Sequence, residues 1–309
     1  MWRLAHHRAL PTGDQPRRCL TAAPHAPGGC TSLLDPVGRY GRPPVDDSSE
    51  RAVEEARLVL DARQELYGES DPVTFDAMLQ LGRTLRDAGR LREAERVLTS
   101  SLSLQNRLAE PDEVRLRWTD FNLAIVFDRL GEHEAARRLW ERVLESADRD
   151  DGPDSELSRQ TATNLAITLR KLRRYGDEFP LRVRVLDSTR RVLGPDSGAT
   201  IRAEIDLAQT HRHLGNHELA LGLFAQALAG LERTGGDQRT ILYQKWAIAT
   251  ELVALKRSQE ASQMFDEVVA GAIEHLEPDD PFRRSAVRQR RGYWLLGKFS
   301  GRGRKPRRG

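Results

Sequence analysis

Apolar residues along this chain recur at the spacing of an α-helix, in pairs of segments joined by a short turn. After Pro111, apolar positions three or four residues apart mark one face of a helix, namely Trp118, Phe121, Ala124, Phe127 and Leu130. Gly131 then predicts the end of that helix, because glycine adopts the left-handed conformation of a C-cap without steric penalty. A second apolar face follows at Ala135, Ala136, Leu139, Trp140, Val143 and Leu144. The pattern predicts two antiparallel helices with a tight turn between them.

The turn between the two helices recurs at a fixed period. Its copies begin at positions 88, 130, 172, 214 and 255 of the chain. The period indicates stacked units, since one helix pair cannot bury its apolar stripe alone. The sequence therefore predicts an all-α solenoid of about five helix–turn–helix repeats over residues 48–298.

Half-repeats stand at both ends of the predicted array. Residues 48–67 match a second helix alone, because their small and apolar positions fall one period before those of the first complete repeat: Ala52, Ala56, Val59 and Leu60 precede Ala94, Leu98, Ser101 and Leu102. Residues 282–298 match a first helix alone. We expect these half-repeats either to act as caps or to reflect descent from a longer protein. In the second case an exposed apolar edge would favour self-association.

The third repeat departs from the pattern in its second helix. Where the other repeats carry a small residue, it carries Glu178, and Pro180 follows two residues later. Proline inside a helix removes a hydrogen bond and clashes with the preceding turn. We therefore expect this helix to start late or to be kinked.

The two ends of the chain differ in composition from the repeats. Residues 1–47 are dense in proline and glycine and lack helical periodicity, so we expect this segment to be disordered. It contains no apolar stretch of the signal-peptide type. Its Cys19 and Cys30 match no metal-ligand spacing, and we expect a cytoplasmic protein with reduced thiols, no metal, no cofactor and no membrane contact. Residues 299–309 form a basic tail that we also expect to be disordered.

The net charge of +3 conceals parts of opposite sign. Residues 281–309 contain eleven Lys and Arg and no acid, whereas residues 1–45 carry six basic and two acidic residues. Residues 46–280 therefore carry a net charge of −12. The chain combines an acidic helical array with a basic tail.

Several of these residues resemble the tetratricopeptide repeat in a long form with this period, as found in kinesin light chains and in bacterial regulatory proteins. The resemblance rests on the recurring turn, on the openers Gly152-Pro153-Asp154 and Gly194-Pro195-Asp196, and on Asn122-Leu123-Ala124 and Asn164-Leu165-Ala166. It covers about residues 48–298. The resemblance implies a right-handed superhelix whose first helices line a concave groove. Because the family binds many unrelated ligands, it does not identify the partner.

The predicted groove positions are richer in positive charge than the rest of the array. Over four repeats they hold seven basic and four acidic residues. Arg and Lys can bind a carboxylate or phosphate, and the resemblance implies that the asparagines hydrogen-bond an extended peptide backbone. The predicted ligand-binding residues are Arg83, Arg86, Asn122, Arg129, Asn164, Arg170, Lys171 and Arg212. Charge reversal of both Arg170 and Arg212 is predicted to abolish binding without unfolding the array.

A structural role for these side chains is the alternative. Asp87 with Arg129, or Asp128 with Arg170, would then form ion pairs within the array. Four aromatic residues fall at helical spacing and are expected in the core: Trp118, Trp140, Trp246 and Phe265. Two histidines at the turns, His133 and His217, are expected to be solvated. His211 and His213 are two residues apart, hence on different faces of one helix, which argues against a paired metal site.

Catalysis finds no support among the motifs of the chain. It has no Gly-x-x-x-x-Gly-Lys-Ser/Thr loop, no Gly-x-Ser-x-Gly turn and no His-Glu-x-x-His. We therefore expect a non-enzymatic module, an adaptor or regulatory sensor that binds a peptide or protein segment in its groove. A sensor half of a larger ATPase-type switch is a second hypothesis.

The basic tail supports one further hypothesis. Arg302-Gly303-Arg304-Lys305-Pro306 is similar to the core of an AT-hook, in which Arg-Gly-Arg enters the narrow minor groove of DNA. The candidate nucleic-acid residues are Arg302, Arg304, Lys305, Arg307 and Arg308. A nucleic-acid-associated regulator acting through this tail is therefore an alternative to the groove-binding module.

Overall fold

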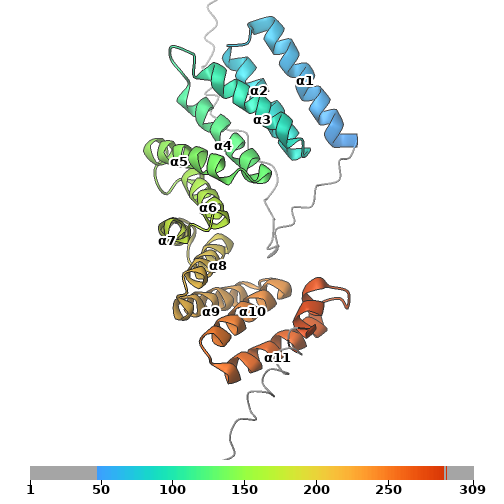
Figure 1. The fold of residues 1–309 in the computed structure, drawn as a ribbon, viewed down its shortest axis with the longest axis vertical. Helices are drawn as coiled ribbons and strands as arrows, with labels where there is room; N and C mark the ends of the chain where they lie inside the picture. The colour runs from blue at the N-terminus through green and yellow to red at the C-terminus, as the bar shows by residue number, and fades with distance from the viewer. Residues whose placement is uncertain (1–46, 289, 291–309) are drawn as a thin grey trace, which may run out of the picture. The chain divides into compact units, whose positions relative to one another are not determined.

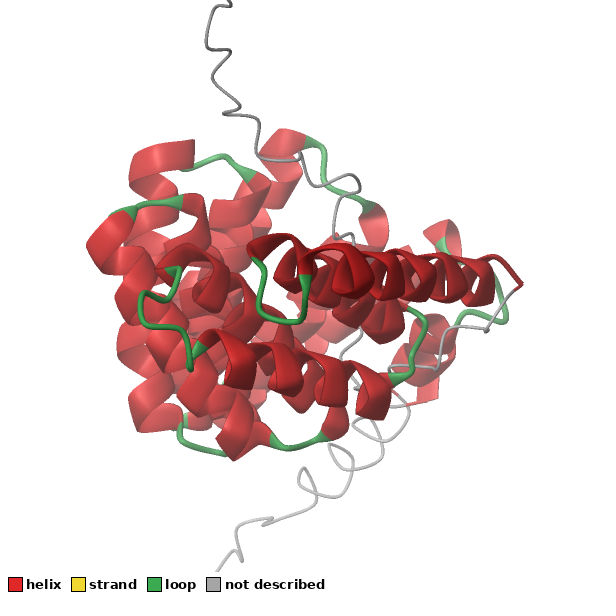
Figure 2. Ribbon diagram, turned by 90° about the horizontal axis from the view of Figure 1, so that it is seen from above, coloured by secondary structure: helices red, strands yellow, loops and turns green. Residues whose placement is uncertain are grey.

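Helices form nearly all of the structure in the described part of the chain. The computed structural model describes residues 47–288 and residue 290. Its labelled helices are α1 (Asp47–Tyr67), α2 (Pro72–Asp87), α3 (Leu91–Gln105), α4 (Glu113–Leu130), α5 (His133–Asp150), α6 (Glu156–Lys171), α7 (Tyr175–Leu193), α8 (Gly198–His213), α9 (His217–Thr234), α10 (Gln238–Ala254) and α11 (Ser258–His275). A further helical stretch covers residues 281–288 and 290. The described residues contain no strand, and short loops join the helices (Figure 2).

Each helix packs against the next one along the chain, from α1 to α11, and α2 also packs against α4 (Figure 1). This is the packing of a solenoid, in which a repeat contacts mainly its neighbours. The first helices of the repeats are α2, α4, α6, α8 and α10, and the second helices are α3, α5, α7, α9 and α11. The predicted all-α solenoid is confirmed. No described helix is both long enough and apolar enough to cross a lipid bilayer.

First and second helices begin in different ways. Each first helix has an Asp or Ser N-cap whose side chain accepts a backbone N–H of the first turn, as Ser155 does from Ser158 at 3.1 Å. Such a cap stabilises a helix by about 1 kcal/mol. No side-chain cap is present at the start of the second helices α3, α5, α7, α9 and α11. These helices follow directly from the tight turn.

The tight turn places one residue per repeat in the left-handed region. Gly131 has φ 83° there, and Gly89 and Gly215 have 76° and 77°. The copies that begin at positions 172 and 255 have no glycine at this place and carry Arg173 with φ 59° and Lys256 with φ 61°. The turn therefore keeps its left-handed backbone conformation even in the two repeats that lack the glycine.

The third repeat keeps its register despite Pro180. Helix α7 begins at Tyr175, one period after the start of α5 and one period before that of α9. Of the two outcomes expected, the late start is therefore wrong, and the kink stays a prediction. The start is fixed by the turn before it, where the N–H of Arg174 donates to the carbonyl of Leu169 at 2.9 Å. The same bond joins Glu132 to Phe127 in the preceding repeat, also at 2.9 Å. Pro180 then lies inside the helix.

Helix α1 is the predicted lone second helix, and only part of its expected apolar face is buried. Val53 and Leu60 lie in the core, whereas Ala52 and Val59 are exposed. In the complete repeats the equivalent positions, Ala94 and Ser101, are fully buried. The difference arises because no described helix precedes α1 to cover this side.

Several predictions concern residues outside the described part. These are most of the 1–47 segment with Cys19 and Cys30, the end of the 282–298 half-repeat, and the 299–309 tail. The nucleic-acid candidates also lie there: Arg302, Arg304, Lys305, Arg307 and Arg308.

Candidate ligand-binding face

The predicted groove residues lie on α2, α4, α6 and α8, and we call this surface the first-helix face. One position in the last turn of these helices recurs once per repeat. It is occupied in turn by Arg86, Asp128, Arg170 and Arg212. What each of these side chains contacts is set largely by residues one repeat away.

Arg86 binds the first of the two predicted asparagines. Its Nη1 donates to Asn122 Oδ1 at 2.7 Å, and Asn122 Nδ2 donates to the carbonyl of Trp118 at 2.8 Å. Asn122 is also buried. Both ends of this amide are therefore engaged within the array. Arg129 of α4 is also bonded to α2, because its Nη1 donates to the carbonyl of Arg86 at 2.6 Å.

Asn164 occupies the same repeat position but is free. Within the described structure its side chain makes no hydrogen bond, and it is half-buried. The residue one repeat earlier that would reach it is Asp128 rather than an arginine. Asp128 instead contacts residues of its own repeat and of α6. Asn164 is thus the asparagine whose amide remains available to a ligand.

Asp128, on α4, is contacted by residues of two other helices, α5 and α6. It accepts hydrogen bonds from Trp140 Nε1 at 3.0 Å and Thr168 Oγ1 at 2.6 Å, and lies 3.0 Å from His133 Nδ1. Lys171 Nζ is 3.6 Å from the same carboxylate. The expected pair of Asp128 with Arg170 is therefore wrong, because that carboxylate is already surrounded.

The second expected pair, Asp87 with Arg129, is also not formed. Asp87 accepts instead from Arg86 Nε at 2.8 Å. The two turn histidines are likewise more engaged than expected. His133 contacts Asp128, and His217 Nδ1 lies 2.8 Å from Glu251 Oε2. Both rings are positioned by a buried or half-buried carboxylate rather than by water alone.

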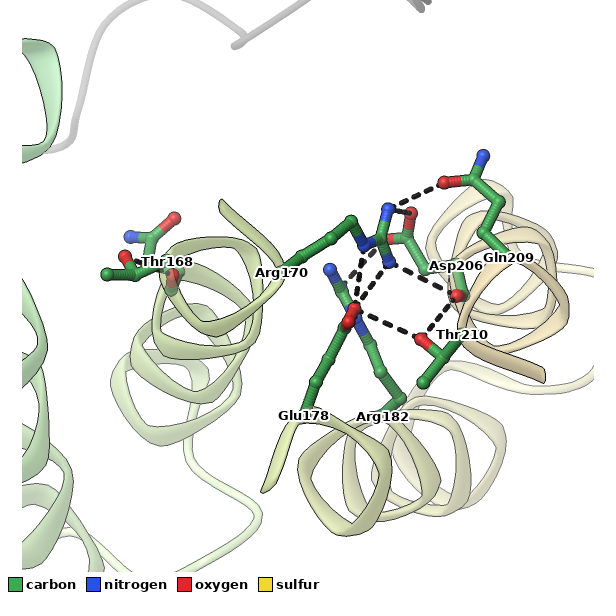
Figure 3. A network of polar contacts seen from close by, with 8 residues as sticks. Thr168, Arg170, Glu178, Arg182, Asp206, Gln209 and Thr210 are labelled. Atoms are coloured by element: carbon green, nitrogen blue, oxygen red, sulfur yellow. Dashed lines mark hydrogen bonds and ion pairs between the residues drawn. The ribbon is translucent and has the colours of Figure 1, made fainter. Parts of the chain in front are cut away.

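Arg170 belongs to a polar network between α6, α7 and α8 (Figure 3). Its Nε donates to Glu178 Oε1 at 2.8 Å and its Nη1 to Gln209 Oε1 at 2.6 Å. Thr210 Oγ1 donates to the same Glu178 oxygen at 3.0 Å. Arg182 Nη1 donates to Asp206 Oδ2 at 2.9 Å. Arg170 is therefore held within the array, by a glutamate that is itself fully buried.

Arg182 was not singled out from the sequence. Its position in α7 is one that the other second helices fill with an apolar residue, so the sequence pattern did not indicate an ion-pair partner for it. The signal that could have identified it is the nearby Glu178. The two residues are four apart on one helix, which is the spacing of an i,i+4 ion pair.

Arg212 repeats the arrangement in the next unit. Its Nε donates to the buried Glu251, and its guanidinium lies 4.7 Å from the ring centroid of Phe224. Arg170 and Arg212 thus each neutralise a buried carboxylate. Removing either cation would leave a buried charge without its partner, which is strongly destabilising.

Two other arginines on the first-helix face remain free. Arg83 and Arg202 are exposed and make neither a hydrogen bond nor an ion pair with any described residue. Exposed apolar groups share their repeat positions: Ile167 is 37% exposed and Trp118 is 41% exposed. Trp118 was expected in the core, and this expectation is wrong, because its position faces outward from α4. Trp140 and Phe265 are buried as expected, and Trp246 is half-buried.

Burial lowers the pKa of two histidines of α8 that contact α7, His211 and His213. The ring of His211 packs edge-on against Phe179, with centroids 5.2 Å apart. Burial lowers the pKa of His211 below its ordinary value of 6.5, because the charged form loses hydration. Among the described residues no cluster of His, Cys, Asp and Glu could hold a metal ion.

Known proteins share the repeat and the fold. Models of the tetratricopeptide repeat match residues 74–112, 115–178, 159–198 and 179–233, which together span about half of the chain. No curated protein matches the chain in sequence.

Similar solved structures include BtubC (BKLC) from P. vanneervenii, with a TM-score of 0.60 and 19% identity over 76% of this chain and 96% of that one. A P. anserina protein assigned as a kinesin light chain, with nearly identical TPR-like repeats, has a TM-score of 0.55 and 18% identity over 60% and 88%. YrrB, a TPR protein with an unusual peptide-binding site, has a TM-score of 0.52 and 14% identity over 75% and 99%. The matched repeats and their regular packing together show that the chain belongs to the tetratricopeptide repeat family.

Proposed function

We propose that this protein is a non-enzymatic interaction module, an adaptor or regulatory sensor, that binds a peptide or protein segment along its first-helix face. The observation that carries the proposal is a set of groups on that face that are at least partly exposed, and whose polar members make no side-chain hydrogen bond or ion pair with a described residue. They are the cations Arg83 and Arg202, the amide of Asn164, and the exposed side chains Trp118 and Ile167.

The chemistry of these groups suits an extended peptide with apolar and acidic residues. A free asparagine amide can donate to and accept from a peptide backbone. Trp118 offers a large apolar surface at a low cost in conformational entropy. Arg83 and Arg202 can each bind a carboxylate through two parallel hydrogen bonds. Because the backbone of this face is already ordered in packed helices, the ordering cost on binding is confined to the side chains.

The other predicted groove residues receive a different role in this proposal. Arg86, Arg129, Arg170 and Arg212 use their donors on neighbouring helices, and Lys171 lies beside Asp128. In the proposal they hold the face in shape, and most of their charge is balanced by neighbouring carboxylates. Asn122 is held in the same way by Arg86. The fold likeness to YrrB, a TPR protein with an unusual peptide-binding site, supports a peptide as the ligand.

A charge-reversal pair tests the proposal. Arg83→Glu with Arg202→Glu changes two exposed arginines that have no partner in the described structure. The matched control is Arg96→Glu with Arg138→Glu, which makes the same charge change at exposed arginines of the second helices α3 and α5. Peptides selected from a displayed random library against the full chain serve as ligands.

The selected peptides should be enriched in acidic and apolar residues. Their Kd should rise about tenfold or more in the first variant and stay unchanged in the control, since each lost charged hydrogen bond is worth about 1.5–3 kcal/mol. An equal loss in both variants would point to net charge alone and would contradict a specific face. Deletion of residues 299–309 should leave peptide binding intact; loss on that deletion would move the function to the basic tail.

A further inference from the structure

Two positions in each second helix lie in the core of the repeat. A small residue is followed four residues later by a large apolar one, and both are buried: Ala94 and Leu98, Ala136 and Trp140, Ala220 and Phe224, Ala261 and Phe265. In α7 the same two positions hold Glu178 and Arg182. They are as deeply buried as the apolar pairs, with 0% and 1% of the side chains exposed. The third repeat, formed by α6 and α7, therefore has a charged pair at the core positions where the other repeats have an apolar pair.

The buried charges are compensated but not fully satisfied. Glu178 Oε1 receives Arg170, Thr210 and Arg182, the last at 3.0 Å. The other oxygen, Glu178 Oε2, and the Arg182 Nη2 group are buried without a hydrogen-bond partner among the described residues. With Arg170 and Asp206 the layer holds two positive and two negative charges (Figure 3). Desolvation of such a group offsets most of the attraction between the charges.

The apolar core also divides close to this layer, across α8. The first apolar cluster extends from α1 to one side of α8, where it includes Ala203 and Leu207. A second cluster begins on the other side of α8, with Ile201, Ile205 and Ala208, and continues to α11. In the repeats before α7 the large apolar residue joins neighbouring helices into one cluster. Arg182 replaces that residue at the contact between α7 and α8.

We propose that the layer between α7 and α8 is a joint at which the array opens, so that α8–α11 can lose its contact with α7 while α1–α7 stays folded. In a repeat array each interface contributes its own share of stability, and the array yields first at the weakest interface. Apolar residues remain at one end of this interface, with Val185 and Leu186 on α7 in the same cluster as Ala203. The charged end of the interface is therefore the end that yields.

Two residues of the joint, Arg170 and Asp206, are partly exposed on the first-helix face. Arg170 and Asp206 are each 22% exposed, whereas Glu178 and Arg182 are buried beneath them. An acidic group bound at Arg170 would compete with Glu178 and Asp206 for its donors. An effect of ligand binding on the opening of the joint rests on the proposed function, whereas the existence of the joint does not.

Hydrogen exchange of the full chain, followed by mass spectrometry, tests the joint. Native-state exchange at low urea resolves segments that open below the global unfolding free energy. We expect a step in protection between α7 and α8, with α8–α11 opening as one unit. Fraying from the C-terminal end would instead give protection that declines gradually towards α11. A gradual decline with no step at α7–α8 overturns the proposal.

A repacked layer provides the second measurement. Glu178→Ala with Arg182→Leu restores the pair found at Ala94 and Leu98, and leaves Arg170 and Asp206 to neutralise one another. Replacing a buried ion pair with apolar residues is often stabilising, so exchange of α8–α11 should slow about tenfold or more and the step should vanish.

The control is Arg174→Ala in the same repeat, which removes an exposed pair with Asp177 and should leave the step in place. A step that persists in the repacked variant contradicts the joint. If that variant does not fold, the exchange profile of the wild-type chain decides alone.

Discussion

At the scale of single residues, a repeat position does not determine what its side chain does. Asn122 and Asn164 occupy equivalent places, yet Arg86 engages the first and nothing described engages the second. The difference comes from the residue one repeat earlier, arginine in one case and Asp128 in the other. The availability of a side chain for a ligand is therefore set by its neighbour in the stack.

The two turn residues that replace glycine offer a stability test. Arg173 and Lys256 hold φ near 60°, a conformation that costs an L-residue about 1–2 kcal/mol and glycine almost nothing. Glycine also gains freedom in the unfolded chain, which opposes this by about 0.4–1 kcal/mol. Arg173→Gly and Lys256→Gly should each raise the free energy of unfolding by about 0.5–1 kcal/mol.

Urea unfolding monitored by circular dichroism measures this gain. Gly131→Ala provides the reverse change at the same repeat position, where φ is 83°, and should destabilise the protein by a similar amount. A gain in stability from the alanine, or a loss from both glycines, would show that the turn geometry is not the cause.

At the scale of elements, helix number, order and register could be predicted from the sequence. They follow from apolar periodicity and from a turn motif that recurs once per repeat, both of which are local signals. The start of α7 shows the strength of the register, since Pro180 does not displace it. The partners of the charged side chains could not be predicted. Arg170 faces Glu178 eight residues away and Gln209 thirty-nine residues away, and nothing in the spacing chooses between such candidates.

Helix α8 should make stability depend on pH through His211. Its pKa is below 6.5 in the folded chain because the ring is buried against Phe179, and it returns to about 6.5 on unfolding. Between these two values the unfolded chain binds a proton that the folded chain does not. The contribution of this group to stability is therefore complete above pH 6.5 and declines as the pH falls through that window.

The substitution His211→Phe keeps the aromatic contact and removes the titration. The decrease in midpoint urea concentration between about pH 7.5 and 5.5 should be smaller in this variant than in the wild-type protein. An identical decrease in both proteins would assign the pH dependence to other groups.

At the scale of the whole molecule, the positive charges divide into two classes with different consequences. Reversal of Arg170 and Arg212 was expected to abolish binding without unfolding. Their partners in the structure, Glu178 and Glu251, are buried, so this expectation has to be replaced. Arg170→Glu with Arg212→Glu should destabilise the array by about 3–5 kcal/mol at each site, enough to unfold a typical domain.

Thermal unfolding separates the two classes. The Arg83→Glu, Arg202→Glu variant should keep a wild-type Tm, because surface substitutions without partners change stability by about 0.5 kcal/mol or less. The Arg170→Glu, Arg212→Glu variant should lose its helical signal or melt far below the wild-type protein. Equal melting of the two variants would contradict the division.

The short reach of the contacts between repeats has a consequence for synthesis of the chain. Arg129 bonds to a residue 43 positions upstream, and His217 contacts one 34 positions downstream. A repeat therefore meets its upstream neighbour once about one more period has left the ribosome, which takes roughly 2–8 s at about 5–20 residues per second. Once the first repeats have folded together, we expect each new helix pair to pack on the repeat made before it. Growth in this order would limit the apolar surface that is exposed during synthesis.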